Sequence, residues 1–333
     1  MDPLIEVPLW IWLATMAGVV ALLALSFFTH IRDAHEPTTK EAGAWTAFFV
    51  SLSILFGCGL TLVWGWDRGL EFFAGYITEY SLSIDNLFVF VIIMSSFAVP
   101  RDLQQKVLLV GVIVALILRT IFILLGAAAI AHFSWVFYIF GLILILTALK
   151  LAFEKHDENE TYEPNFMVRM MQKILPATDE YDGARMTTVI DGKRYMTPMM
   201  IVMLAIGMTD ILFALDSIPA IYGLTNVPYI VFTTNAFALL GLIELYFLIG
   251  GLLKKLVYLS LGLSVVLGFI GIKLVNEAMH TNTLPFLNGG QPIHLLPAIS
   301  TSLSLVIIVS ILAATTIASL LKNRRDARGS ANG

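Results

Sequence analysis

Two stretches of this 333-residue sequence carry acidic side chains at a matching spacing. Each stretch places an acid, five further residues, a second acid and then a small polar residue; the members are Glu79, Asp85, Asn86, Asp210, Asp216 and Ser217. Carboxylate, amide and hydroxyl oxygens are the ligands that hard divalent cations such as Mn²⁺, Mg²⁺ or Ca²⁺ prefer, whereas Zn²⁺ and Cu⁺ favour imidazole and sulfur. A proton is the other candidate, because burial favours the neutral form of a carboxyl group.

Further charged and polar residues lie in similarly apolar surroundings; they are Arg119, Lys150, Asn235, Glu244 and Lys273. A charged side chain at the centre of a membrane helix costs about 2.5–3.5 kcal/mol, so such groups must pair, stay protonated or bind a cation. We interpret Arg119 as a counter-charge to an acid, and Lys150 and Lys273 can extend toward opposite interfaces. Asn235 and Glu244 are candidates to support the ligands or to relay an ion. The alternative is that these acids and bases form salt bridges that only set helix packing.

Helical geometry separates the two acids of each stretch. Positions seven apart share a face of a regular helix, whereas positions six apart diverge by about 120°. Glu79 therefore shares a face with Asn86, and Asp85 points to the flank; the second stretch repeats this pattern. Local unwinding, which Pro219 makes feasible, would instead bring all four carboxylates together. We hypothesise that the two helices cross near the membrane midplane and pool these carboxylates.

The elements that must position these residues are transmembrane helices. Hydrophobic residues make up 58% of the chain and charged residues 13%, and a helix needs about 20 apolar residues to cross a bilayer. Nine such stretches are present: 8–28, 44–64, 70–98, 107–131, 134–153, 196–222, 228–252, 255–275 and 296–321. We predict an all-α polytopic membrane protein, with residues 1–333 forming one membrane domain in the lipid bilayer. The net charge of −4 carries no nucleic-acid signature.

The basic residues predict an orientation for the nine spans. Most of the 20 Lys and Arg residues lie on the cytoplasmic side if the N-terminus is outside and the C-terminus inside, as the positive-inside rule requires. That side then holds the polar loop 154–195, with a short amphipathic helix over 166–175 and a β-hairpin turning at Asp191-Gly192, and the basic tail 322–333. Glu71 falls near the outer interface, where we expect it to be solvated.

The two acidic spans are three spans apart, so they run in opposite directions. Spans three to five (66–153) and six to eight (196–275) each end with a Lys-Leu pair, at Lys150 and Lys273. This pattern predicts an inverted repeat of two three-helix units, an arrangement that builds transporters with a binding site near the midplane. The middle spans of the two units match poorly, because Arg119 has no basic counterpart.

Four segments of the sequence closely resemble the TerC/Alx family of integral membrane proteins. They are YITEYSLSIDNLFVF (76–90), GKRYMTP (192–198), DILFALDSIPA (210–220) and GFIGIK (268–273). The resemblance implies Mn²⁺ export across the bacterial cell (inner) membrane, on the paired three-helix repeats of the lysine-exporter superfamily. It also implies that the six motif residues named above handle the metal. Some members of that family are linked to metalation of exported proteins and to membrane-protein assembly.

We therefore expect a transporter that exports a hard divalent cation, Mn²⁺ first, with proton coupling as an option. The alternative is a non-transporting membrane scaffold in secretion, metalation, or tellurite and envelope stress responses. Buried acids favour transport, because a scaffold has no use for surplus carboxyl groups in hydrocarbon. No span carries a nucleophile–base pair, so we expect neither an enzyme nor a catalytic cofactor. A homo-oligomer or a partner from the secretion machinery stays open.

Overall fold

The computed structural model describes residues 7–28, 38–133, 135–153, 178, 180–190, 192–249 and 258–329. Within these ranges, nine segments are helical, long and apolar enough to cross a membrane, which confirms the predicted all-α polytopic fold. The helices are α1 (Leu9–Ser26), α2 (Thr39–Trp64), α3 (Trp66–Ser96), α4 (Arg101–His132), α5 (Val136–Phe153), α7 (Pro198–Tyr222), α8 (Pro228–Leu240), α9 (Leu242–Ile249), α10 (Leu259–His280) and α11 (Thr301–Gly329). Helices α8 and α9 together make one span, which is interrupted at Gly241.

Local chemistry explains several helix boundaries. The Thr38 hydroxyl accepts a hydrogen bond from the Glu41 N–H at 3.3 Å and so caps α2. Pro198 and Pro228 occupy the first positions of α7 and α8, where a missing N–H costs nothing. Gly65 alone separates α2 from α3 at φ +92°, a backbone conformation that favours glycine.

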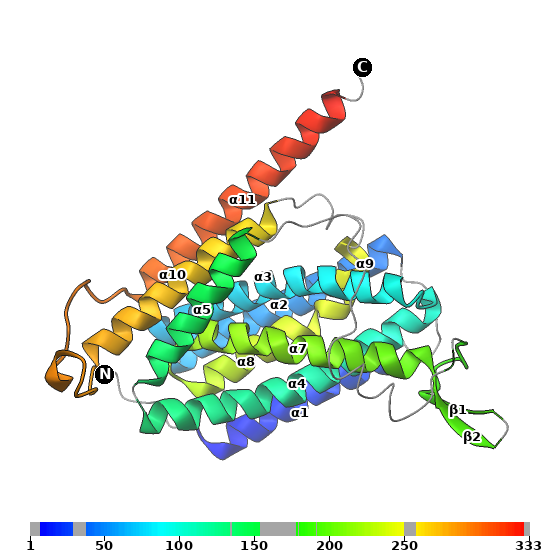
Figure 1. Cartoon of the computed structure of the whole chain (residues 1–333), viewed down its shortest axis with the longest axis horizontal. Coiled ribbons are helices and arrows are strands. Elements are labelled where there is room, and N and C mark those ends of the chain that lie inside the picture. Colours follow the sequence, from blue (N-terminus) through cyan, green and yellow to red (C-terminus); the bar gives the residue numbers. More distant parts are fainter. Residues whose placement is uncertain are drawn as a thin grey trace.

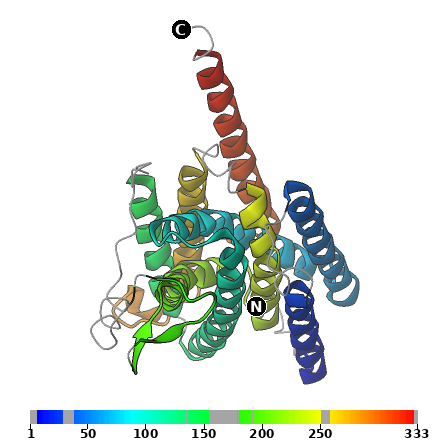
Figure 2. The ribbon, with the colours of Figure 1, turned by 90° about the vertical axis from the view of Figure 1, so that its right-hand side faces the viewer.

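The centre of the bundle is formed by α3, α4, α7 and α8 (Figure 1). Every residue of α8 from Tyr229 to Leu240 is buried, because α3 packs on one side of this helix and α4 on another. Helices α1 and α11 are mostly exposed and lie at the periphery, and α11 extends well beyond the rest of the bundle (Figure 2). The central helices therefore form the protected interior in which polar groups can gather.

Helices α5 and α10 form a closely packed pair, inclined across the central helices (Figure 1). Glycine makes this approach feasible: a Cβ on Gly141 would lie 2.9 Å from the Gly271 carbonyl oxygen, and a Cβ on Gly271 would lie 3.0 Å from the Gly141 carbonyl oxygen. Small residues allow the backbones of membrane helices to approach in this way.

The predicted β-hairpin is confirmed. Strand β1 (Thr187–Ile190) pairs antiparallel with β2 (Lys193–Met196), and Ile190 stands opposite Lys193. The Tyr181 hydroxyl donates a hydrogen bond to the Phe97 carbonyl oxygen at 2.8 Å, at the C-terminal end of α3. Burial raises the pKa of Tyr181, which keeps this donor protonated. The short helix predicted over 166–175 and Asp191 of the hairpin turn lie outside the described residues.

These contacts define one end of the bundle, called here the hairpin end. The C-terminus of α3 lies there through the Tyr181 contact, and the N-terminus of α7 lies there because it follows β2 directly. Helices α3 and α7 therefore run in opposite directions, as an inverted repeat requires. The repeat itself, spans 66–153 against 196–275, stays a prediction, as do the assignment of the hairpin end to the cytoplasm and the division of the chain into these units.

Candidate functional site

Arg119 lies at the centre of a cluster of polar side chains inside the bundle. It comes from α4, its side chain is 1% exposed, and it is among the largest fully buried side chains of the described residues. Three other helices surround its guanidinium: α3 contributes Glu79, α7 contributes Asp210 and Ser217, and α8 contributes Asn235. All four of these side chains are also buried.

The guanidinium donates hydrogen bonds to both carboxylates. Nη1 pairs with Glu79 Oε1, while Nη2 lies 3.2 Å from Asp210 Oδ1 and Nε lies 3.4 Å from Asp210 Oδ2. Nη1 also donates to Asn235 Oδ1 at 2.9 Å and to Ser217 Oγ at 3.2 Å. The Asn235 amide is held by a second hydrogen bond, from Nδ2 to the Val231 carbonyl oxygen at 2.9 Å, which directs its oxygen toward the guanidinium.

The cluster has more acceptor capacity than Arg119 uses. Glu79 Oε2 is buried and has no hydrogen-bond partner among the described residues. Two ionised carboxylates and one guanidinium leave a net charge of −1 in a water-poor interior, where an unbalanced charge is costly. The described part of the chain brings no three His, Cys, Asp or Glu side chains together at a metal-binding spacing. A cation here would need the neutral oxygens of Ser217 and Asn235 besides the two carboxylates.

Asp85 and Asp216 lie away from this cluster, so the hypothesis that four carboxylates are pooled is wrong. Asp85 Oδ1 accepts a hydrogen bond from Ser260 of α10 at 2.9 Å, and Asp216 Oδ1 accepts one from Thr147 of α5 at 2.7 Å. Both α3 and α7 stay helical through these positions, with Pro219 accommodated inside α7. Without local unwinding, the 120° divergence keeps the second acid of each stretch facing a different neighbour.

The two outlying acids lie on opposite sides of the cluster along the bundle. Six residues of α-helix rise about 9 Å, which places Asp85 toward the hairpin end of α3. The same rise places Asp216 toward the other end, because α7 runs in the opposite direction. The two outlying acids are therefore separated along the bundle by the cluster at the Arg119 guanidinium.

The remaining predicted residues fall into different settings. Asn86 is buried on α3 but is not among the side chains that contact Arg119. Lys150 is exposed and lies within electrostatic reach of Asp216, and Lys273 is half-buried within reach of Glu71. Neither lysine is part of the cluster around the guanidinium.

Buried polar groups also gather toward the hairpin end. Glu244, in the first turn of α9, is 1% exposed, and its Oε2 has no partner among the described residues. Gln105 is 1% exposed with both amide atoms unpartnered in the same described set. Its neighbour Gln104 accepts a hydrogen bond from the Tyr246 hydroxyl at 3.2 Å, which joins α4 to α9. Gln105 precedes Arg119 by 14 residues and shares its helix face, a spacing that sequence reasoning could have noticed.

Glu71, toward the opposite end, is buried rather than solvated, and this corrects the expectation. It accepts hydrogen bonds from Arg68 Nη1 at 2.7 Å and from the Thr225 hydroxyl at 2.6 Å. The loop after α7 supplies Thr225 and covers this carboxylate. Sequence alone offered no signal for that contact, because it joins residues 154 positions apart.

Residues 64–327 match a family model described as the integral membrane protein TerC family. The match covers most of the chain and includes every residue of the Arg119 cluster. The chain belongs to the TerC family. No solved structure shows a significant match to it.

Curated relatives of this TerC protein come from several bacteria. It is 47% identical over 322 residues to an uncharacterized membrane protein of Mycobacterium tuberculosis H37Rv, covering 96% of this chain and 81% of the relative. It is 39% identical over 314 residues to one of Myxococcus xanthus, covering 94% and 93%. It is 38% identical over 277 residues to an Escherichia coli K12 protein named "Putative membrane-bound redox modulator Alx", covering 80% and 85%.

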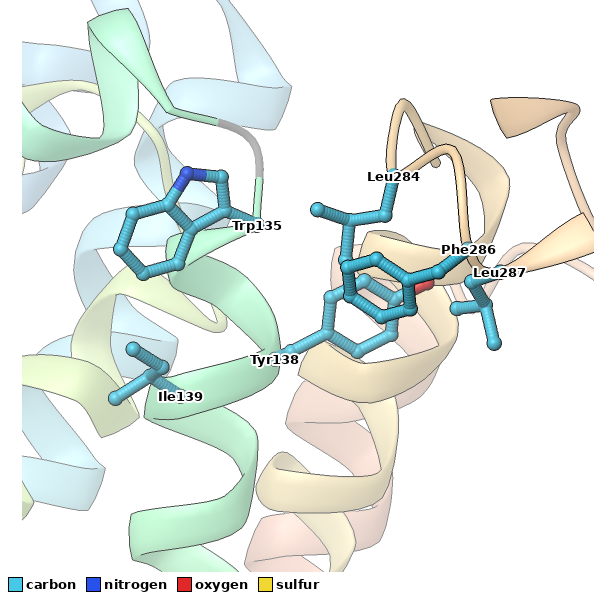
Figure 3. Close-up of a pocket in the computed structure, with 6 residues that line it drawn as sticks. All are labelled: Trp135, Tyr138, Ile139, Leu284, Phe286 and Leu287. Carbon is cyan, nitrogen blue, oxygen red and sulfur yellow. The ribbon is translucent and has the colours of Figure 1, made fainter. Parts of the chain in front are cut away.

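The TerC protein also has a hollow of about 450 Å³ away from the acids, between α5 and the loop that follows α10. Figure 3 shows Trp135, Tyr138 and Ile139 on one side of it, with Leu284, Phe286 and Leu287 on the other. This lining is apolar apart from the Tyr138 hydroxyl and the Trp135 indole N–H. It offers no cation ligands, so the Arg119 cluster is the stronger candidate for chemistry.

Proposed function

We propose that the protein exports a hard divalent cation, with Mn²⁺ as its substrate, from the cytoplasm. The observation that carries this proposal is the convergence of Glu79 and Asp210, from two antiparallel helices, on one buried cluster. Burying carboxylates between membrane helices is costly, and a scaffold gains nothing from it that apolar packing would not provide. A pathway for cations explains why the protein keeps these carboxylates despite the free-energy cost of burying them.

The substrate class follows from the atoms that the cluster offers. Both oxygens of each carboxylate, the Ser217 hydroxyl and the Asn235 amide oxygen are hard ligands of the kind that Mn²⁺, Mg²⁺ and Ca²⁺ accept. Within the described residues no cysteine or histidine reaches the cluster, so softer metals lack their preferred ligands. Mn²⁺ is chosen among the hard cations on the family resemblance.

Buried and half-buried acids supply a route for the cation. Glu244 and Asp85 lie toward the hairpin end, Glu79 and Asp210 at the centre, and Asp216 toward the far end. We expect the cation to bind from the hairpin end and to leave at the other as one three-helix unit rocks against its partner. Proton counter-transport through these carboxylates is the coupling option that we propose for this cycle.

A redox role, as the Escherichia coli relative's name describes, is not proposed for this chain. A thiol–disulfide cycle needs two cysteines, or one cysteine with a partner thiol. Cys58 is the only cysteine in the sequence, and it lies exposed on α2. No pair of thiols within these residues can therefore carry such a cycle.

The first test is Mn²⁺ flux in proteoliposomes, comparing wild type with Glu79→Gln and Asp210→Asn. Each variant removes one of the two ligand charges and keeps the side-chain shape, so we expect flux to fall by at least about a hundredfold. Asp182→Asn is the matched control: Asp182 lies outside the spans, paired with Arg185 at the exposed surface, and its flux should equal that of wild type.

Background flux in wild type, with the protein correctly inserted, would overturn the proposal. It would move the assignment to the non-transporting scaffold in secretion, metalation or stress responses. Wild-type flux that persists in Glu79→Gln and Asp210→Asn would instead keep transport and reject this site.

A further inference from the structure

Arg119 holds the position that a cation would occupy. Its guanidinium contacts one oxygen of Glu79, both oxygens of Asp210, the Ser217 hydroxyl oxygen and the Asn235 amide oxygen. These atoms come from three helices, α3, α7 and α8, and all of them are suited to a hard cation. The guanidinium therefore uses the same ligand shell that a divalent cation would need.

The charges of the Arg119 guanidinium and of a divalent cation prevent both from occupying the site together. With both carboxylates ionised and Arg119 in place, the formal charge of the cluster is −1, and adding a divalent cation would bring it to +1 in an interior with little water. If the guanidinium leaves as the cation binds, the two carboxylates neutralise the divalent charge completely. Unbalanced charge inside the bilayer is costly, so replacement is favoured over joint occupancy.

Arg119 also leaves one oxygen of this ligand shell without a hydrogen bond. Glu79 Oε2 is fully buried and unpartnered among the described residues. An arginine that served only to neutralise and fix this carboxylate would be expected to engage both of its oxygens, as the fork does with Asp210. A compact cation bound by both oxygens of Glu79 would satisfy the orphaned atom.

We propose that Arg119 is a tethered cation that fills the transport site in its cation-free state and that the divalent cation binds by displacing it. This inference rests on the proposed transport function and deepens it. Return of the guanidinium to Glu79 and Asp210 then expels the cation, so Arg119 sets both the affinity of the site and its rate of release. The structure corresponds to the arginine-occupied state of that cycle.

The test is Mn²⁺ binding to purified full-length protein, measured by titration calorimetry and by the loss of the free Mn²⁺ electron paramagnetic resonance signal. Arg119→Met removes the competitor and should tighten Mn²⁺ binding by at least about tenfold, because the site gains a net negative charge. Flux in the same variant should fall below about a tenth of wild type, because nothing displaces the bound cation. Lys106→Met, which removes a positive charge elsewhere on α4, is the control and should bind as wild type does.

Arg119→Lys keeps the test decisive if Arg119→Met fails to fold, which is a risk when a buried ion pair loses one partner. An ammonium group makes fewer contacts than the guanidinium fork and competes less well. Mn²⁺ should therefore bind the lysine variant more tightly than wild type and less tightly than the methionine variant. Equal or weaker binding in the folded variants would overturn the tethered-cation proposal.

The two proposals fail in distinguishable ways. If wild type shows no flux but the binding order Arg, Lys, Met holds, the transport function is rejected and the competition stands. If wild type carries Mn²⁺ but the three proteins bind it equally, the competition is rejected and transport stands.

Discussion

Arg119 shows how one residue sets the chemistry of its neighbours. An arginine keeps its charge inside a protein, so Glu79 and Asp210 are held next to a permanent cation although both are buried. Asp85 and Asp216 instead accept hydrogen bonds from hydroxyl groups on α10 and α5. Four acids that look equivalent in their motifs therefore divide into two that contact Arg119 and two that flank the cluster.

This division predicts different effects for the two kinds of acid. Asp85→Asn and Asp216→Asn can keep their hydrogen bonds to Ser260 and Thr147 but lose a charge on the route to the centre. We expect each to lower Mn²⁺ flux at least about fivefold while the dissociation constant for Mn²⁺ stays within about threefold of wild type.

Parallel flux and binding measurements check this prediction. Glu79→Gln is the comparison variant, and it should weaken both quantities. Loss of Mn²⁺ binding in Asp85→Asn or Asp216→Asn would show that these acids are ligands after all.

The pairing of α5 with α10 matters because these helices carry the hydroxyl partners of the flanking acids. Gly141 and Gly271 bring the two backbones into contact, and a Cβ on Gly141 would also lie 2.6 Å from Val275 Cγ2. This pair of helices positions Thr147 against Asp216 of α7 and Ser260 against Asp85 of α3. Helix packing thus fixes where the flanking acids find their partners.

We expect Gly141→Ala to destabilise the protein by about 1–3 kcal/mol, because the added methyl group overfills the contact. Gly18→Ala on α1 is the matched control, since nothing lies within 4 Å of a Cβ there. That control should leave stability unchanged or raise it by up to about 1 kcal/mol, as glycine-to-alanine changes in helices do. Thermal unfolding in detergent measures both, and a melting temperature of Gly141→Ala at or above wild type would contradict the packing argument.

At the scale of the whole molecule, the buried polar groups form a series from one end of the bundle to the other. Glu244 lies toward the hairpin end, the Arg119 cluster lies in the middle, and Glu71 lies toward the far end beside Arg68. Surrounding helices such as α1 and α11 present mainly exposed apolar side chains, which suits a lipid environment. The direction of the proposed transport depends on which end faces the cytoplasm.

The predicted orientation places the hairpin inside the cell and the loop between α10 and α11 outside. In a Cys58→Ser background, we expect an impermeant thiol reagent to label Phe286→Cys on intact cells, because Phe286 is 84% exposed. Val189→Cys, on the exposed hairpin, should react only after permeabilisation. Labelling of both positions from the same side would contradict an odd number of spans between them, and the reverse pattern would invert the topology.

Hydropathy by itself determined the fold class and the spans, and the Asp191-Gly192 turn indicated the hairpin. These features depend only on runs of neighbouring residues. The motif spacing also identified Glu79, Asp210 and Ser217 as members of one site, and the cost of a lone membrane charge indicated a counter-charge role for Arg119. The pooling of Asp85 and Asp216 and the solvation of Glu71 were wrong. Those outcomes depend on how each helix is rotated and on which distant segment covers it.

Asn235 was a candidate from the sequence, and the tertiary structure placed it in the cluster. Only the tertiary structure decided that hydroxyl groups satisfy the other acids, through the pairs Thr225 with Glu71, Thr147 with Asp216 and Ser260 with Asp85. Hydroxyl groups are common in apolar helices and bond to their own backbone as readily as to a distant side chain, so spacing alone cannot select these partners. Their selection follows from packing between helices far apart in the sequence, above all the close contact that Gly141 and Gly271 allow.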